Sequence, residues 1–251
     1  PTIGIGHKVL NTDAEADLSV HEVHEEVSEE ECISEGRCYE LFQQDVQIAI
    51  DGCRQIYDNW EVMGLKGTGS ANIEVDNIFI PEHRIISRVD QREGTAKGTK
   101  TQKDKLYSTP YLTISPAALA AVVVGCAAGG LKEFIKFAKK SSQRGIKLCE
   151  RESIQLRIAE SAAEVDCAKL LIEQLAQATT LKMRTSGTLT TEERAKARRD
   201  TAYACSLAKR SVERLFEVSG ANGLYSDRHF QRYYRDVKAG SNHIAIGWDR
   251  C

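Results

Sequence analysis

Apolar residues recur every three or four positions over the second half of the chain, a spacing that predicts long amphipathic helices. The clearest case is residues 150–186, whose buried stripe would be formed by Ile154, Ile158, Ala162, Val165, Ala168, Ile172 and Leu175. At about 1.5 Å per residue, this helix would be roughly 50 Å long. No proline follows Pro116, and the remainder is rich in the strong helix formers Ala, Leu, Glu, Lys and Arg.

Capping signals divide this half into four predicted helices. Ser115-Pro116 has the form of an N-cap with proline at the first helical position, which opens a helix to about Ser141. Gly187 would end the second helix, and the capping box Thr190–Glu193 would begin a third that closes at Gly220. A fourth helix would run from a Ser226 cap to Gly240. Long helices with short connections predict a four-helix bundle.

The first half alternates apolar and polar residues in short runs, as strands do. Glu40–Ile50, Ala71–Ile80 and the stretch around Trp60 are expected strands, and Gly64–Ser70 is expected to connect two of them as a turn. The predicted fold class is therefore α+β. Its expected divisions are an acidic segment (1–39), a partial β-barrel (40–91), a mobile polar linker (92–115) and a helical bundle (116–251).

Composition argues against several classes of protein. The 251 residues carry a net charge of −2, which gives no overall reason to expect nucleic acid or membrane binding. We find no apolar run near the ~20 residues of a spanning helix, and the opening residues lack a signal-peptide pattern. The 8 cysteines show no zinc spacing. We expect reduced cysteines that pack in a cytoplasmic protein, as at Cys126, Cys167 and Cys205.

Two motifs invite ligand-binding interpretations that their spacing does not support. The Gly64–Ser70 turn lacks the lysine of a phosphate loop and the third glycine of a dinucleotide fingerprint, although its amides and the Thr68 and Ser70 hydroxyls could still donate to a ligand. His21 and His24 are three apart in an acidic stretch, whereas the helical zinc-protease pattern needs four. No metal site is predicted.

The C-terminal residues combine glycines, arginines, tyrosines and a histidine. Glycine lets a backbone approach a ligand closely, arginine binds phosphate, and histidine moves protons near neutral pH. Arg232, Arg235 and Asp236 form either a surface salt-bridge set or part of an anion site. His243 follows the predicted helix end and precedes an apolar run, so we expect it to be partly buried, as a structural or a functional histidine.

Two stretches carry a family resemblance. Asn59–Ser70, continuing to Pro81, resembles the middle-domain signature of the acyl-CoA-dehydrogenase-like flavin-dependent monooxygenases, the oxygenase components of two-component systems. Ala202–Ala221 and Arg232–Asp249 resemble the C-terminal bundle of the same family. The likeness extends over about residues 56–250. No counterpart of the catalytic glutamate of true acyl-CoA dehydrogenases is found, which favours the hydroxylase branch.

The resemblance implies a helical domain, a β-barrel and a four-helix bundle, commonly in a tetramer, with flavin between barrel and bundle. A separate flavin reductase would supply reduced FMN or FAD. The flavin C4a-hydroperoxide would then hydroxylate an aromatic or polyketide-like small molecule, with His243 bonded to the peroxide or taking a proton from a phenol. The cofactor-binding residues that the resemblance implies are Trp60, Ser70, Arg144, Gln155, Ser219, Gly220, Ala221, Asn222, Arg232 and Asp236.

The chain departs from the family pattern in its first third. The helical domain and the earlier barrel strands are not recognisable, and residues 1–39 are acidic instead. Three explanations stay open: a processed fragment, a sequence covering part of a longer protein, or a shortened relative that has lost flavin. The last would be a redox-neutral catalyst such as a cyclase or lyase, a non-catalytic partner subunit, or a scaffold for oligomerisation.

Overall fold

The computed structural model describes residues 53–57, 59–75 and 79–248. Their contacts separate two units. The smaller unit contains the described residues up to Glu61 together with those of Gly67–Arg84, and the larger contains Val62–Lys66 and Ile85 onward. The expected strand Glu40–Ile50 and the acidic segment 1–39 lie outside the described residues.

The smaller unit is built on one antiparallel strand pair. Strand β1 (Cys53–Tyr57) pairs with β2 (Asn72–Val75), with an irregularity between Cys53 and Gln55. Short 3₁₀ turns η1 (Lys66–Thr68) and η2 (Glu82–Arg84) follow β1 and β2 respectively. The Gly64–Ser70 segment connects the two strands, as expected. Trp60 lies outside both strands. The described residues therefore do not confirm a partial barrel.

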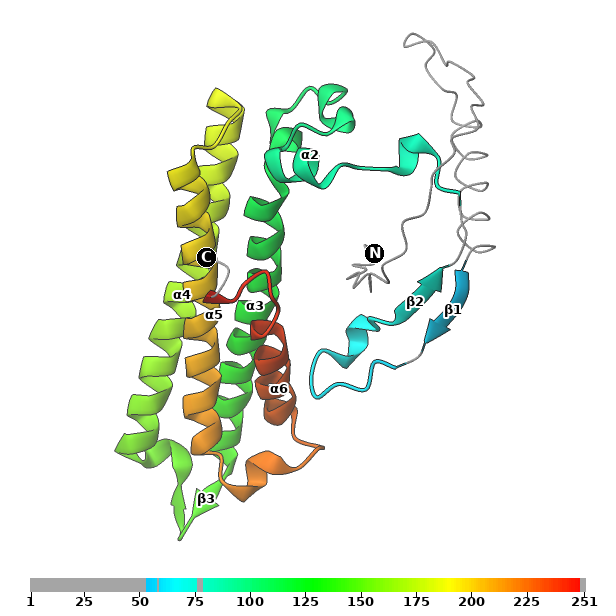
Figure 1. Cartoon of the computed structure of the whole chain (residues 1–251). Helices are drawn as coiled ribbons and strands as arrows, with labels where there is room; N and C mark the ends of the chain where they lie inside the picture. Colours follow the sequence, from blue (N-terminus) through cyan, green and yellow to red (C-terminus); the bar gives the residue numbers. More distant parts are fainter. Residues whose placement is uncertain (1–52, 58, 76–78, 249–251) are drawn as a thin grey trace. The chain divides into compact units, whose positions relative to one another are not determined.

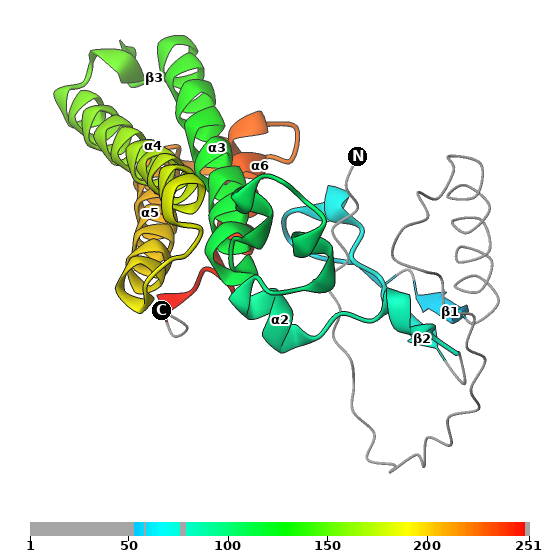
Figure 2. The ribbon, with the colours of Figure 1, turned by 90° about the horizontal axis from the view of Figure 1, so that it is seen from above.

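The larger unit is an antiparallel helical bundle (Figure 1). Its main helices are α3 (Tyr111–Lys140), α4 (Glu152–Ser186), α5 (Thr191–Glu217) and α6 (His229–Ser241). A two-residue strand pair, β3 (Ser142–Gln143) and β4 (Ile146–Lys147), and the turn η5 (Leu148–Glu150) connect α3 to α4. Seen from above, α3 lies between α4 and α6 (Figure 2). The predicted bundle is confirmed.

The connection between α4 and α5 has the predicted caps. The Thr190 hydroxyl accepts from the Glu193 amide at 3.2 Å, and the Glu193 carboxylate accepts from the Thr190 amide at 2.8 Å. Gly187 ends α4 in the left-handed region with φ 74°, where a side chain would be strained. These two signals are local, so the sequence alone locates the turn between α4 and α5.

Two predicted helix starts are wrong. Helix α3 begins at Tyr111, so Pro116 lies inside it and is buried, and Ser115-Pro116 is no cap. Proline there removes only the bond to the Leu112 carbonyl, one turn from the helix start. Helix α6 begins at His229 with Arg228 as its N-cap. The Ser226 carbonyl instead accepts a bond from the Gln231 side chain at 3.0 Å.

The core changes character along the bundle. Small side chains fill the space between α3, α4 and α5, where a buried cluster includes Ala120, Val124, Ala127, Val165, Ala168, Ala204, Ala208 and Val212. Near the β3–β4 end, larger groups take over, and Phe134, Leu215 and Phe230 form a second cluster. Small residues let the helices approach closely, whereas the aromatic rings fill the wider end.

The expected linker is not a loose chain. Residues 88–108 form α2 (Arg88–Glu93) and the 3₁₀ turns η3 (Lys97–Lys100) and η4 (Lys105–Ser108). Asp104 caps η4, and Arg194 of α5 pairs with Glu93 at 2.8 Å. These contacts attach the segment to the bundle, and it belongs to the larger unit.

Helix α3 also corrects the expectation about apolar runs. Among the described residues, it is the one helix whose length and composition would suffice to cross a membrane, with a mean hydropathy of 1.9 over its most apolar stretch. It contacts α4, α5 and α6. A helix that packs against three others is apolar on several faces, and 39% of this stretch is buried within the bundle.

Candidate functional site

Helix α6 holds a loop from the strand-bearing half of the sequence. The Asp236 carboxylate accepts from the Leu65 amide at 2.7 Å, and the Arg235 guanidinium donates to the Met63 carbonyl at 2.7 Å. Gly64 lies so close to the Arg235 backbone that a Cβ there would overlap the carbonyl group. Arg235 and Asp236 therefore hold residues 63–65 in place, a structural role that was not predicted from the sequence.

The position of α6 is fixed from its other side. Phe230 and Val237 are buried, and Tyr234 stacks on Phe216 of α5 with ring centroids 4.0 Å apart. Tyr233 lies against Gly129 and Gly130 of α3, where a Cβ on Gly129 would overlap the tyrosine ring. The two glycines therefore allow a close contact between α3 and α6.

The predicted turn at residues 219–222 presents open backbone to one end of the bundle. Ser219 is buried, and its hydroxyl donates to the Phe216 carbonyl at 2.7 Å. Gly220 has φ +62° and no neighbouring atom where a Cβ would stand. The 3₁₀ turn η6 (Ala221–Leu224) follows, with Ala221 and Asn222 exposed. A ligand could approach the main chain closely here.

Two further predicted residues lie at the same end, because α3 finishes and α4 begins there (Figure 1). Arg144 and Gly145 form the two-residue turn of the β3–β4 pair, with φ of 53° and 78°. Two positive φ values define the turn that matches strand twist best. Arg144 is exposed. Gln155 is exposed as well, and its side-chain amide donates to the Cys149 carbonyl at 2.9 Å.

His243 lies just beyond the other end of α6. It is exposed, so the expectation of a partly buried histidine is wrong for the chain as described. Its Nδ1 accepts from the Ala245 amide at 3.1 Å. A ring nitrogen that accepts carries no proton, so this geometry assigns the proton of the neutral ring to Nε2 and leaves that atom as a donor.

The predicted residues thus form two groups within the larger unit. One lies at the β3–β4 end, and the other is His243, separated from the start of α6 by the 13 residues of that helix, about 20 Å. Arg232 is exposed near the first group, where its guanidinium lies 5.5 Å from the Tyr233 ring centre. A single ligand touching both groups would have to be elongated.

Trp60 and Ser70 belong to the smaller unit. Trp60 is half-buried. The Ser70 hydroxyl lies 3.4 Å from the Thr68 hydroxyl, both on the turn between the two strands. Their assignment to the cofactor stays a prediction.

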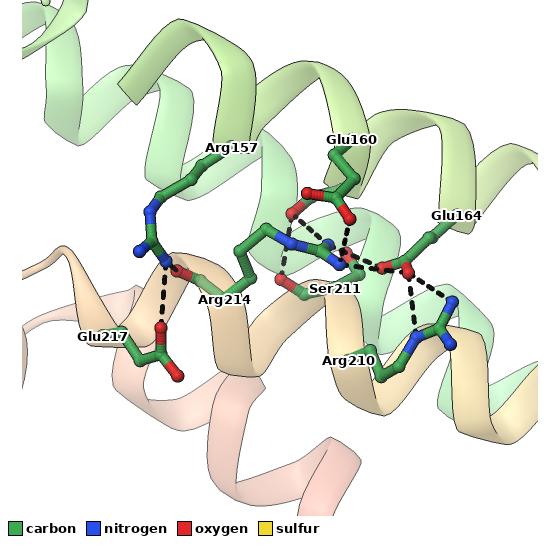
Figure 3. A network of polar contacts seen from close by, with 8 residues as sticks. Arg157, Glu160, Glu164, Arg210, Ser211, Arg214 and Glu217 are labelled. Carbon is green, nitrogen blue, oxygen red and sulfur yellow. Dashed lines mark hydrogen bonds and ion pairs between the residues drawn. The ribbon is translucent and has the colours of Figure 1, made fainter. Parts of the chain in front are cut away.

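A network of charges that was not predicted from the sequence joins α4 and α5 (Figure 3). The Glu164 carboxylate accepts hydrogen bonds from the Arg214 guanidinium at 2.6 Å and from the Arg210 guanidinium at 2.9 Å. The Glu160 carboxylate accepts a further bond from Arg214 at 2.9 Å. Although burial of the Glu164 carboxyl favours a higher pKa, the bonds from Arg214 and Arg210 lower the pKa below its ordinary value. The network has a signal in the sequence: two acidic residues four positions apart on one helix and two basic residues four positions apart on another.

An open cleft of about 470 Å³ lies where the 85–111 segment meets the start of α3, with Asp90, Tyr107, Tyr111 and Ile114 in its wall. None of the predicted site residues lines it. Within residues 53–57, 59–75 and 79–248, no group of His, Cys, Asp and Glu side chains could hold a metal ion.

A bundle of long antiparallel helices, closed by a short Arg-Asp helix that holds a glycine loop, defines an acyl-CoA dehydrogenase-like fold. The family described as "Acyl-CoA dehydrogenase, C-terminal domain" matches residues 117–248, and the chain belongs to it.

Within that family the similarity is to oxygenases. The chain is 33% identical over 205 residues to the FADH(2)-dependent resorcinol hydroxylase, oxygenase component, of Rhizobium sp. (strain MTP-10005), covering 77% of this chain and 50% of the relative. It is 34% identical over 195 residues to the flavin-dependent monooxygenase oxygenase subunit HsaA of Mycobacterium tuberculosis, covering 76% and 49%. The solved 3-HSA hydroxylase from Rhodococcus sp. RHA1 superposes with a TM-score of 0.70 at 32% identity, covering 78% and 51%. The chain spans about half the length of the curated relatives it matches.

Proposed function

We propose that the protein contributes to a flavin-dependent monooxygenase, as part of the oxygenase component that hydroxylates an aromatic or polyketide-like small molecule. The observation that carries this is identity of 33% and 34% to two proteins named as oxygenase components or subunits, over 77% and 76% of this chain. A separate flavin reductase would be the partner, since an oxygenase component implies a second component that supplies reduced flavin.

The residues at the β3–β4 end fit an anionic cofactor. The open main chain at Gly220 and the exposed amide side chain of Asn222 offer hydrogen-bond donors, and the exposed Arg232 offers a guanidinium that matches phosphate. Arg144 adds a second exposed guanidinium at that end. These groups would hold the phosphate or ribityl part of FMN or FAD.

When bound, reduced flavin supplies the oxygen chemistry, through the C4a-hydroperoxide that the resemblance implies. His243 would act near the reacting atoms with its Nε2–H as donor, while the Ala245 amide fixes the ring through Nδ1. Such a site must exclude water. Because His243 is exposed in this chain, a further surface would have to cover it, either from the remaining half of the relatives' length or from a neighbouring subunit.

Flavin binding tests the proposal directly. FMN and FAD are titrated into the protein while the visible flavin band is followed, first oxidised and then reduced without oxygen. We expect perturbation of the band and weaker binding for Arg232→Gln. Arg228→Gln, an exposed arginine at the cap of the same helix, is the matched control and should bind as the wild type does.

Absence of binding by both flavins in both redox states would overturn the oxygenase proposal. Binding of a flat apolar molecule in place of flavin would support the flavin-free alternative instead. Reduced flavin that binds but yields only hydrogen peroxide on exposure to oxygen would indicate that the water-excluding part of the site lies on another chain or segment.

A further inference from the structure

The segment that follows α6 forms a tight turn around His243. The His243 amide donates to the Gly240 carbonyl at 3.0 Å, and the Ile246 amide donates to the His243 carbonyl at 3.0 Å. The Ala245 amide donates to His243 Nδ1 at 3.1 Å. These bonds all lie within residues 240–246. They therefore fix the shape of the turn, but they do not by themselves attach it to the bundle.

Two side chains after His243 make that attachment. Ile246 is buried among the small side chains of the core. Trp248 is 52% exposed, yet its indole Nε1 donates to the Ser206 hydroxyl of α5 at 2.9 Å. Its ring also lies edge-on to Tyr203, with ring centroids 6.4 Å apart. A half-exposed ring gains only part of the free energy of burial, so the directed bond and the ring contact decide where it lies.

The Ser206 hydroxyl is oriented to accept this bond. It donates its own proton to the Ala202 carbonyl, one turn earlier in α5, at 3.0 Å. A serine hydroxyl has one proton to donate and two lone pairs that accept, whereas the tryptophan indole can only donate. The two groups are therefore complementary. A residue at position 206 without a hydroxyl would leave the Trp248 N–H without this acceptor.

The chain enters the turn at a closely packed point. A Cβ on Gly240 would overlap the Val123 side chain of α3 and would come within 3.4 Å of Leu65. The turn is thus held beside α3 at its beginning and on α5 at its end (Figure 1). The His243 ring is exposed and bonds within its own turn, so its location depends on how the turn is attached at these two ends.

We propose that Trp248 is a positioning residue for His243: its bond to Ser206 holds the turn on α5 and thereby sets the direction of the His243 Nε2–H. The role of His243 in the reaction rests on the proposed function. An acid–base group must lie within hydrogen-bond reach of the atom it serves, so a displaced turn would lower product yield without weakening flavin binding. The attachment itself is measured without flavin, so either proposal can fail without the other.

Amide hydrogen exchange, followed by NMR in the flavin-free protein, tests the attachment. Trp248→Phe keeps a ring and removes the donor, and Ser206→Ala removes the acceptor. Each should speed exchange at the Ile246 amide about five-fold, the scale of one lost hydrogen bond. Ser206→Thr keeps a hydroxyl and should exchange as the wild type does. Thr185→Ala loses a similar bond to the carbonyl four residues earlier in α4, and as the matched control it should leave the Ile246 amide unchanged.

A double variant tests whether the two residues act as one unit. Because each single change breaks the same bond, Trp248→Phe combined with Ser206→Ala should exchange no faster than the faster of the two single variants. Additive effects, unchanged exchange in both single variants, or equal acceleration in Thr185→Ala would each overturn the proposal. Circular dichroism establishes that all variants stay helical.

The ring nitrogens of His243 report its positioning directly. Their ¹⁵N signals, assigned by their loss in His243→Ala, distinguish the Nε2–H form from the Nδ1–H form. At a pH where the ring is neutral, the wild type and Ser206→Thr should show the Nε2–H form, and Trp248→Phe and Ser206→Ala should gain the Nδ1–H form. Ring signals that do not change in either variant would refute the positioning role. These responses in a protein that binds no flavin would support that role while overturning the proposed function.

Discussion

The Asp236 carboxylate receives the backbone amide of Leu65 at 2.7 Å, across 171 positions of sequence. Leu65 has φ 54°, in the left-handed region, which a non-glycine residue adopts at some cost. The bond from Asp236, together with the Arg235 contact to the Met63 carbonyl at 2.7 Å, compensates for that conformation. Asp236 is thus an anchor for the loop, whatever else it does.

Removing this anchor should loosen the loop. We expect Asp236→Ala to lower the free energy of unfolding by about 1–2 kcal/mol, since a charge-assisted bond to a half-buried acceptor is lost. Asp236→Asn keeps an acceptor oxygen and should cost about half as much. Urea denaturation measures the stability, and hydrogen exchange at the Leu65 amide should accelerate most in the alanine variant. Unchanged exchange there would show that the bond does not hold the loop.

The charge network between α4 and α5 should contribute more to the free energy of unfolding than the exposed ion pairs beside it. Glu164→Gln would remove the buried carboxylate that both Arg210 and Arg214 contact, and Arg214 would keep its pair with the more exposed Glu160. We expect a loss of about 2–3 kcal/mol of stability. Glu217→Gln removes the carboxylate of an exposed pair with Arg157 and should cost less than about 1 kcal/mol. Thermal and urea unfolding of both variants would compare them, and equal losses would contradict the prediction.

The same carboxylate should make stability depend on pH. The pKa of the Glu164 carboxyl is lowered from an ordinary value of 4.5. As pH falls below about 4.5, the unfolded chain takes up the proton first, so stability decreases until the pH passes the folded pKa. Asp200, whose bonds to Lys196 and Arg199 lower its pKa against the opposing effect of burial, adds a loss in the acid range.

Urea titrations between pH 3 and 6 (about the window that this linkage sets) should therefore give a shallower decline for Glu164→Gln than for the wild type. Glu217→Gln serves again as the control, and should follow the wild-type slope. A decline of equal steepness in Glu164→Gln would show that other carboxylates carry the acid sensitivity.

A variant at His243 should distinguish flavin binding from the hydroxylation reaction. We expect His243→Ala to retain flavin binding within about two-fold, while the yield of hydroxylated product per reduced flavin falls about 100-fold, the scale of a lost acid–base group. Product is quantified by chromatography, and hydrogen peroxide by a coupled assay. Unchanged product yield would remove His243 from the mechanism.

The bundle could be predicted because its signals are local. The Thr190–Glu193 box and Gly187 determine one turn through their own dihedral angles and bonds, and the apolar period of α4 identifies its buried face. The starts of α3 and α6 could not be predicted in this way. Ser115-Pro116 and Ser226 match local capping rules, but tertiary packing overrides those rules. Pro116 is buried against the bundle core, where the helix gains more than one lost bond costs.

The candidate site was harder to predict. Residues 219–222, Arg144 and Gln155 come together because helices of similar length return to one end, which the sequence does imply. His243 is exposed among the described residues, so the apolar run that follows it gave a misleading expectation. The clamp of Arg235 and Asp236 on residues 63–65 required a contact across the whole chain, for which no periodicity or spacing gives a signal.

Gly129 sets how near α6 lies to α3, since a Cβ there would overlap the Tyr233 ring. Arg235 and Asp236 follow Tyr233 within one helical turn and hold Met63 and Leu65. A single methyl group added at position 129 would therefore change the position of residues 63–65, some sixty residues earlier in the chain. Gly129, one of three glycines in α3, thus influences the position of a segment that is distant in the sequence.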